Sequence, residues 1–162
     1  MVTVAEMQAI LDACEHLRDR FLFALLRDSG VRIGAALGLR HADIAAAGRT
    51  VTIVPRDNAN GARCKSRQQH TIPVSAPLIR LWGDYLAAGY GDLDSDYLFV
   101  NPFAEPRGQA WSYAAVYDLV LRLRKKTGID VDPHFLRHAY ATRAQVSGVA
   151  LAASFGKIRE CG

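Results

Sequence analysis

A single pair of strand-like segments interrupts a chain whose other segments show helical periodicity. Residues 49–56 (RTVTIVPR) alternate as a strand does and are rich in Thr and Val, and residues 70–74 (HTIPV) provide a returning strand. Between them, residues 56–69 have the Asn, Gly and Asp content of a hairpin loop. The sequence therefore predicts an α+β domain that is mostly helical, with one small inserted β-hairpin.

Helix signals surround this pair on both sides. Thr3 and Glu6 have the spacing of a capping box, and apolar residues follow them at helical intervals. Gly30 and Gly128 are placed to end helices, and Ser112 is placed to begin one. The expected helices start at about Thr3 and cover residues 18–28, part of 32–39, 76–88, 113–127 and a last segment from Pro133, with an extended piece at 96–101.

Length and composition fit one globular domain without a membrane segment. The 162 residues suffice for a single core, and half of them are hydrophobic. The longest apolar run, residues 21–26, is far too short to span a bilayer, and the first residues do not have the pattern of a signal peptide. The three cysteines lack the spacing of a zinc site or a disulfide framework. We expect a cytoplasmic protein without cofactor or metal.

The charge balance is mildly basic. Twenty Lys and Arg against sixteen Asp and Glu give a formal net charge of +4 and a pI near 9.1. Such a balance is compatible with nucleic-acid binding. On charge alone, a basic surface that serves only solubility explains it equally well.

Two groups of cations precede the second strand. Arg32 follows a glycine turn and sits among apolar residues, where a cation is expected to point into a cleft or to be paired. The ordinary alternative is a solvent-facing arginine at a helix start. The hairpin loop carries a second group, opposed only by Asp57, which consists of Arg56, Arg63, Lys65 and Arg67. Such a loop suits phosphate contact, and a solvated turn explains it as well.

The third group is the sequence HFLRH at 134–138. His134 and Arg137 are three positions apart and so share one face of a helix, and His138 is four positions from His134. Two histidines at this spacing can bind a metal, but the glutamate of the zinc-protease helix and an obvious third ligand are both missing. A metal is therefore not expected, and each histidine alone fits a hydrogen-bonded core residue.

Taken together, the three groups suit a phosphoryl-transfer site. Two arginines can each hold a phosphate through paired N–H donors, a lysine can deliver a proton, and a histidine can assist proton transfer. Guanidinium charge can also replace the metal ion that stabilises pentacovalent phosphorus elsewhere.

The ordered set of motifs resembles the catalytic domain of the tyrosine recombinase, or phage integrase, family. The motifs are SGVRIGAALGLRHADI, then ARCKSRQQHTIPV, then DPHFLRHAYAT, and the resemblance runs from about residue 2 to about residue 150. It implies the fold of a recombinase catalytic core over residues 1–150, with an atypical tail at 151–162. It also implies double-stranded DNA as the partner, together with other recombinase protomers, and neither a membrane nor a small-molecule substrate.

The resemblance assigns roles residue by residue. Arg32 and Arg137 match the two arginines that bind the scissile phosphate, and His134 matches the histidine that assists proton transfer. Lys65 matches the hairpin lysine that protonates the departing 5′-hydroxyl, with its two neighbouring arginines as competitors for that role. The residues expected to add to DNA binding are Arg56, Arg63, Arg67 and His138, the last as a structural residue next to the second arginine.

The chain departs from the family pattern in two respects. It has no Leu-Gly-His box and no tyrosine after Tyr140, whereas the family's nucleophile is a tyrosine near the C-terminus. Ala35 also stands where most members carry an acidic residue. We therefore expect a recombinase catalytic domain that is truncated or frame-shifted. The alternatives are an inactive DNA-binding remnant and a basic RNA-binding or purely structural helical domain.

Overall fold

The computed structural model describes residues 2–62, 68–103 and 105–131. The helices in these ranges are α1 (Val4–Ala13), α2 (Leu17–Ser29), α3 (Ile33–Leu37), α4 (Ala76–Asp84) and α5 (Tyr113–Thr127), with a 3₁₀ turn η1 (His41–Asp43) and a π-helical turn η2 (Tyr85–Tyr90). The strands are β1 (Ile44–Ala45), β2 (Thr50–Ile53) and β3 (His70–Pro73). The expected α+β architecture with helix dominant is confirmed.

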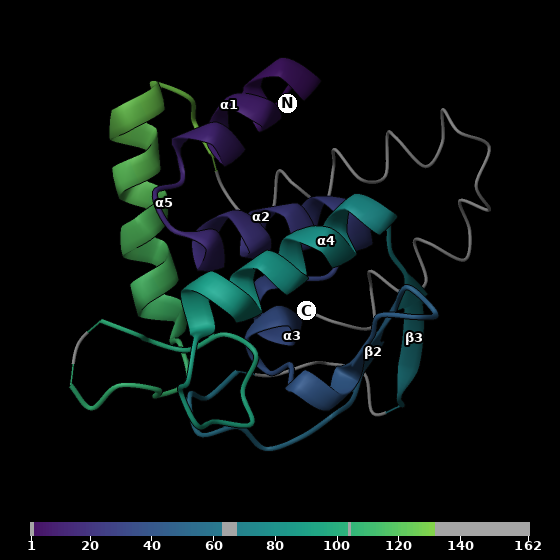
Figure 1. The fold of residues 1–162 in the computed structure, drawn as a ribbon. Coiled ribbons are helices and arrows are strands. Elements are labelled where there is room, and N and C mark those ends of the chain that lie inside the picture. The colour runs from purple at the N-terminus through teal and green to yellow at the C-terminus, as the bar shows by residue number, and fades with distance from the viewer. Residues whose placement is uncertain (1, 63–67, 104, 132–162) are drawn as a thin grey trace.

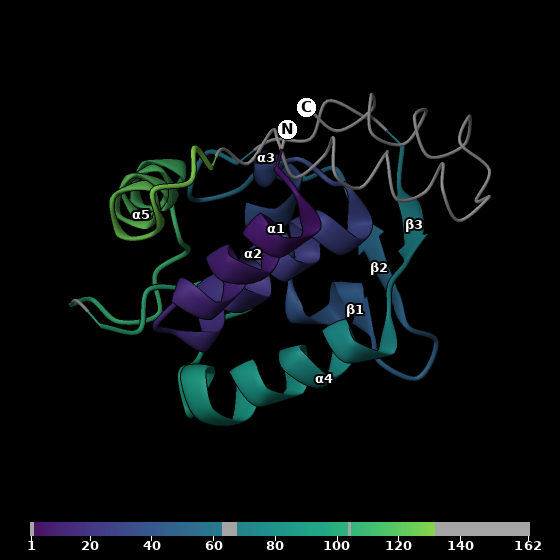
Figure 2. The same cartoon turned by 90° about the horizontal axis from the view of Figure 1, so that it is seen from above.

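Helix α2 forms the centre of the molecule. Its buried residues lie on all of its faces, and α1, α3, α4 and η2 all pack against it. Figures 1 and 2 show α5 at one end of α2 and the sheet at the other. Because side chains on every face of α2 are buried, including the charged Arg18 and Asp19, the other elements are arranged around this helix.

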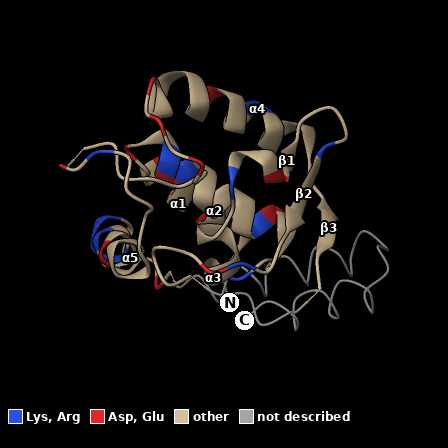
Figure 3. Ribbon diagram, turned by 90° about the horizontal axis from the view of Figure 1, so that it is seen from below, with Lys and Arg blue, Asp and Glu red and all other residues tan. Residues whose placement is uncertain are grey.

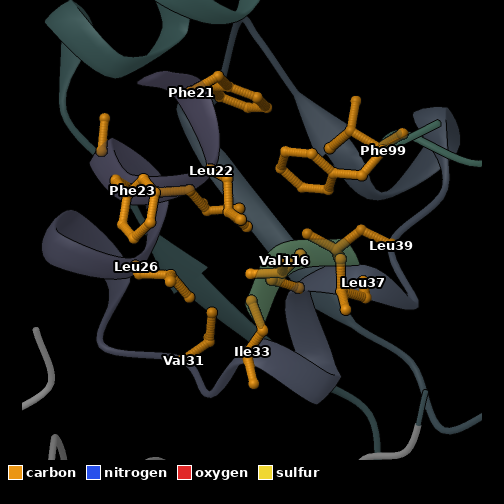
Figure 4. Packing of buried hydrophobic residues seen from close by; sticks show 14 of the residues in the cluster. Phe21, Leu22, Phe23, Leu26, Val31, Ile33, Leu37, Leu39, Phe99 and Val116 are labelled. Atoms are coloured by element: carbon orange, nitrogen blue, oxygen red, sulfur yellow. The ribbon is translucent and has the colours of Figure 1, made fainter. Parts of the chain in front are cut away.

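Aromatic and branched side chains fill the space around α2. The ring of Phe21 stacks against those of Phe99 and Tyr85, with centroid distances of 5.4 and 5.7 Å. Figure 4 shows side chains from α2, α3 and α5 pointing toward one another around the same core, together with Leu39 and Phe99. The core therefore joins segments from before and after the sheet.

The local helix signals are confirmed at the positions predicted. The Thr3 hydroxyl accepts a hydrogen bond from the Glu6 N–H at 3.0 Å, and the Glu6 carboxylate accepts one from the Thr3 N–H at 3.4 Å. Gly30 and Gly128 both end helices with φ of 72°, a conformation that favours glycine. The Ser112 side chain caps α5 by accepting a hydrogen bond from a backbone N–H of its first turn.

The sheet has one more strand than predicted. Its order is β1-β2-β3, all antiparallel, and Val51 lies opposite Ile72 with both side chains buried. The two-residue strand β1 is too short to give a sequence signal of its own. It joins β2 through a turn in which Arg49 has φ of 52°.

Two other predictions need adjusting. The helix predicted over 76–88 continues to residue 90, because the π-helical turn η2 follows α4 directly. The extended piece at 96–101 pairs only through isolated bridges, Tyr97 with Arg40 and Val100 with Ala110. The helix predicted from Pro133 lies outside the described residues. No helix in the described ranges is long and apolar enough to cross a membrane.

Candidate functional site

Of the eight predicted site residues, the structure describes Arg32 and Arg56. The six that lie outside the described ranges are Arg63, Lys65, Arg67, His134, Arg137 and His138. Figure 3 shows basic residues spread over α2, α4, α5 and several loops, with acidic residues among them. The described residues contain no group of three or more His, Cys, Asp or Glu arranged to hold a metal ion. The particular contacts of each cation are therefore more informative than the net charge.

Arg32 is a half-buried arginine at the start of α3. It follows the left-handed turn at Gly30 and takes the N-cap position of α3, where its carbonyl accepts the Ala36 N–H at 3.1 Å. Its Nε is enclosed by protein and has no hydrogen-bond partner among the described residues. Ala35, three positions on, is buried and supplies no carboxylate. Among the described residues, the guanidinium of Arg32 thus has no acidic partner.

Arg56 has a different environment. Its two terminal nitrogens donate to the two carboxylate oxygens of Asp43 at 2.7 and 2.8 Å. These hydrogen bonds raise the pKa of Arg56 above its usual value. The expected opposing acid was Asp57, but the carboxylate that binds Arg56 belongs to Asp43, whose side chain is only 4% exposed. Arg56 is therefore neutralised within the fold.

The loop after β2 is fastened to the body of the protein by polar contacts. Asn60 Nδ2 donates to the carbonyls of Leu37 and Trp111 at 3.0 and 2.8 Å. The Ala59 N–H donates to the Tyr97 hydroxyl at 2.7 Å. The loop residues up to Ala62 are thus held next to the C-terminal end of α3. Arg32 is the N-cap residue at the other end of this helix.

Asn58 and Arg40 make further contacts that hold the loop after β2. Asn58 Nδ2 donates to the Ala62 carbonyl at 2.8 Å, and its Oδ1 accepts a hydrogen bond from Arg40 at 2.8 Å. The guanidinium of Arg40 lies over the Tyr97 ring, with the Arg40 Cζ atom 3.8 Å from the ring centroid. Glycine at position 38 leaves room for Asn58, because a Cβ there would lie 2.9 Å from Asn58 Nδ2.

These anchoring residues were not predicted from the sequence. Asp43, Asn58 and Asn60 look like ordinary turn residues when each is read alone. The Asn-rich composition of the loop was noted, but the composition does not reveal which carbonyls the amides reach.

The hydroxyl groups of the described tyrosines have different surroundings. The hydroxyls of Tyr85 and Tyr90 donate to backbone carbonyls at 2.8 and 2.7 Å, and burial raises the pKa of both above the usual value. The Tyr97 hydroxyl accepts the loop N–H described above. Tyr113 and Tyr117 are half-exposed on α5. Tyr140 lies outside the described residues.

The half-buried His41 should make the free energy of unfolding depend on pH. Its ring meets that of Tyr90 at 4.7 Å, and burial lowers its pKa below 6.5, opposed by a hydrogen bond to the Ser95 backbone and the charge of Asp96. The folded state therefore binds fewer protons than the unfolded state. The contribution of His41 to the free energy of unfolding is complete above about pH 6.5. It is lost as the pH falls from that value toward the lower pKa that His41 has in the folded state.

Urea denaturation between about pH 7.5 and about pH 5 checks this expectation. The loss of stability on acidification should be smaller in His41→Asn than in the wild-type protein. Identical losses in the two proteins would assign the pH dependence to the other histidines.

Comparison with known proteins places this geometry in a family. A sequence model described as the phage integrase family matches residues 1–153. Transposase A from transposon Tn554 of Staphylococcus aureus is 40% identical over 140 residues, which cover 85% of this chain and 39% of the transposase. Tyrosine recombinase XerA of Pyrococcus horikoshii is 29% identical over 148 residues, covering 91% of this chain and 48% of XerA.

Solved structures share the fold. A crystal structure of XerA recombinase aligns with a TM-score of 0.71 at 23% identity, over 90% of this chain and 50% of that one. The Tn1549 transposon integrase in complex with transposon right end DNA aligns with a TM-score of 0.74 at 17% identity, over 94% and 55%. The chain thus spans about half the length, or less, of the proteins that it matches.

Proposed function

Since the chain belongs to the phage integrase family, the family of the tyrosine recombinases, we propose that it forms the phosphate-binding part of a site-specific DNA recombinase. Its partner is double-stranded DNA, bound together with other recombinase protomers, and it acts in the cytoplasm. The observation that carries the proposal is the environment of Arg32, a half-buried arginine without an acidic partner among the described residues.

The energetics of Arg32 favour an anionic ligand. A guanidinium without a counter-charge gains from an anionic ligand, because its hydrogen bonds to phosphate oxygens are charge-assisted and roughly twice as strong as neutral ones. A guanidinium also matches a phosphate group geometrically, since it can donate two parallel hydrogen bonds to two oxygens. Arg56 lacks this opportunity because Asp43 already takes both of its terminal nitrogens.

The remaining roles follow from the resemblance. Arg32 and Arg137 bind the non-bridging oxygens of the scissile phosphate, and His134 assists proton transfer. Lys65 protonates the departing 5′-oxygen as a tyrosine hydroxyl forms a 3′-phosphotyrosyl bond. The arginines supply the positive charge that stabilises the pentacovalent transition state.

Substitution of Arg32 tests the proposal by DNA binding. Arg32→Ala should weaken binding to a duplex by about tenfold and reduce the slope of log K against log salt by about 1, the effect of losing one phosphate contact. Arg32→Lys should keep the slope and lose part of the affinity, because lysine retains the charge without the paired donors.

Arg80→Ala is the matched control, since Arg80 is an exposed arginine on α4 with no polar partner in the part of the chain that the structure describes. Fluorescence anisotropy at several salt concentrations measures both quantities. Equal affinities for wild-type and Arg32→Ala proteins would contradict a phosphate-binding role for Arg32.

The second candidate function is DNA binding without cleavage. It is favoured by the hydroxyls of Tyr85, Tyr90 and Tyr97, which are all engaged in hydrogen bonds within the fold. A nicked suicide substrate separates the two candidates, because the family's cleavage step leaves a covalent protein–DNA adduct. Detection of that adduct with the 162-residue chain would exclude binding alone.

A further inference from the structure

The ion pair between Asp43 and Arg56 joins two separate parts of the fold. Asp43 ends the 3₁₀ turn η1, directly before β1, and its carboxylate also accepts the Arg40 N–H at 2.9 Å. Arg56 lies in the loop that follows β2, and its carbonyl accepts a hydrogen bond from Asn58 Nδ2 at 3.3 Å. The pair thus connects the turn after α3 to the first residues of the loop.

We propose that Asp43 and Arg56 are positioning residues, which fix the loop after β2 beside α3 and act on DNA binding only through that loop. This inference rests on the proposed function for its DNA readout. It replaces the expectation that Arg56 itself contacts phosphate.

The geometry opposes a direct phosphate contact by Arg56. Both terminal nitrogens are already used in short hydrogen bonds to Asp43. If Arg56 turned toward a phosphate, the Asp43 carboxylate would remain buried without its counter-charge, which is strongly unfavourable. The pair is therefore expected to stay intact when DNA binds, since its carboxylate is buried.

The loop contacts explain why the pair matters for the site. The fixed loop reaches α3 through the hydrogen bond from Asn60 to the Leu37 carbonyl. Helix α3 has five residues and so rises only about 7.5 Å, with Arg32 at its first end. Helix α3 therefore connects Arg32 to the loop that the Asp43–Arg56 pair holds.

The first test is the sign of the effect of Asp43→Asn on DNA affinity. If Arg56 contacted phosphate, removal of the competing carboxylate would free it and tighten binding. If the pair positions the loop, the Asp43→Asn variant should populate the ordered conformation of the loop less often. If that population falls to about one tenth, the apparent Kd for DNA rises about tenfold. Tighter or unchanged binding by Asp43→Asn would overturn the proposal. Asp84→Asn, an exposed carboxylate on α4, controls for the change in net charge.

Conservative variants of Arg56 separate charge from geometry. Arg56→Lys keeps the charge and loses the paired donors, so it should weaken binding about as much as Arg56→Gln does. Rescue by lysine would point to a simple phosphate contact and contradict the proposal. The double variant Asp43→Asn with Arg56→Gln should be no weaker than either single variant, because each change alone already removes the pair.

Hydrogen exchange without DNA provides an independent readout. The amides of Ala59 and Ala62 are protected by hydrogen bonds to the Tyr97 hydroxyl and to Asn60 Oδ1. In Asp43→Asn both should exchange about tenfold faster, while the Ile10 amide in α1 should be unaffected. Unchanged exchange at Ala59 and Ala62 would overturn the positioning role. Faster exchange in a protein that binds no DNA at all would support that role and count against the proposed function.

Discussion

Replacement of Phe99 by alanine is expected to lower the free energy of unfolding by about 3–5 kcal/mol. The Phe99 side chain is fully buried at 0% exposure, and its ring lies 5.4 Å from that of Phe21 and 6.3 Å from that of Trp111. Alanine would leave a cavity between α2 and the residues before α5. The surrounding rings cannot close such a cavity completely, because they are held by their own elements.

Chemical denaturation measures this loss, and Phe103 provides the matched control. Phe103 is 59% exposed, although its ring lies near His16 and Arg18. Phe103→Ala should therefore lower stability by less than about 1 kcal/mol. Similar losses for the two variants would contradict the assignment of Phe99 to the core.

Replacement of Arg18 by alanine is expected to lower stability by about 3–5 kcal/mol, the usual effect of removing one partner of a buried ion pair. Arg18 pairs with the buried Asp19, with Nη2 and Oδ1 2.9 Å apart, and it donates to the Val100 carbonyl at 3.2 Å. Its guanidinium also lies 3.7 Å from the centroid of the Trp111 ring. Alanine would leave the Asp19 carboxylate buried without a counter-charge.

A neighbouring arginine and a double variant make this prediction specific. Arg20, on the same helix, is half-buried and donates to the Leu11 carbonyl at 3.2 Å, so Arg20→Ala should lower stability by about 1 kcal/mol. Arg18→Met with Asp19→Asn removes both charges and should recover part of the loss. If Arg18→Ala were no more harmful than Arg20→Ala, the pair would contribute little to the fold.

The helices could be predicted because their signals are local. The Thr3 capping box, the Ser112 cap and the left-handed glycines at 30 and 128 each depend on residues within one turn. Strands β2 and β3 could be predicted from alternation and β-branched content. Strand β1 could not be predicted, because two residues are too few to show an alternating pattern. It is recognised only by its pairing with β2 in the structure.

The predicted site depended on contacts that the sequence does not show. Arg32 and Arg56 read alike as cations near turns, yet one has an enclosed Nε without a partner and the other is bound on both terminal nitrogens. The difference comes from Asp43, which the fold brings to Arg56 by pairing β1 with β2. A local pattern can identify a cation, but tertiary structure decides whether its charge is available to a ligand.

The close approach of Gly38 and Asn58 should constrain which residues can occupy these two positions in homologous chains. The φ of −88° at Gly38 is open to any L-residue, so the backbone conformation alone does not require glycine. A side chain would instead displace Asn58, which cannot move aside freely because its amide is bonded to Arg40 and Ala62. In homologous chains, a larger residue at position 38 should therefore appear together with a change at position 58, and the two positions should co-vary.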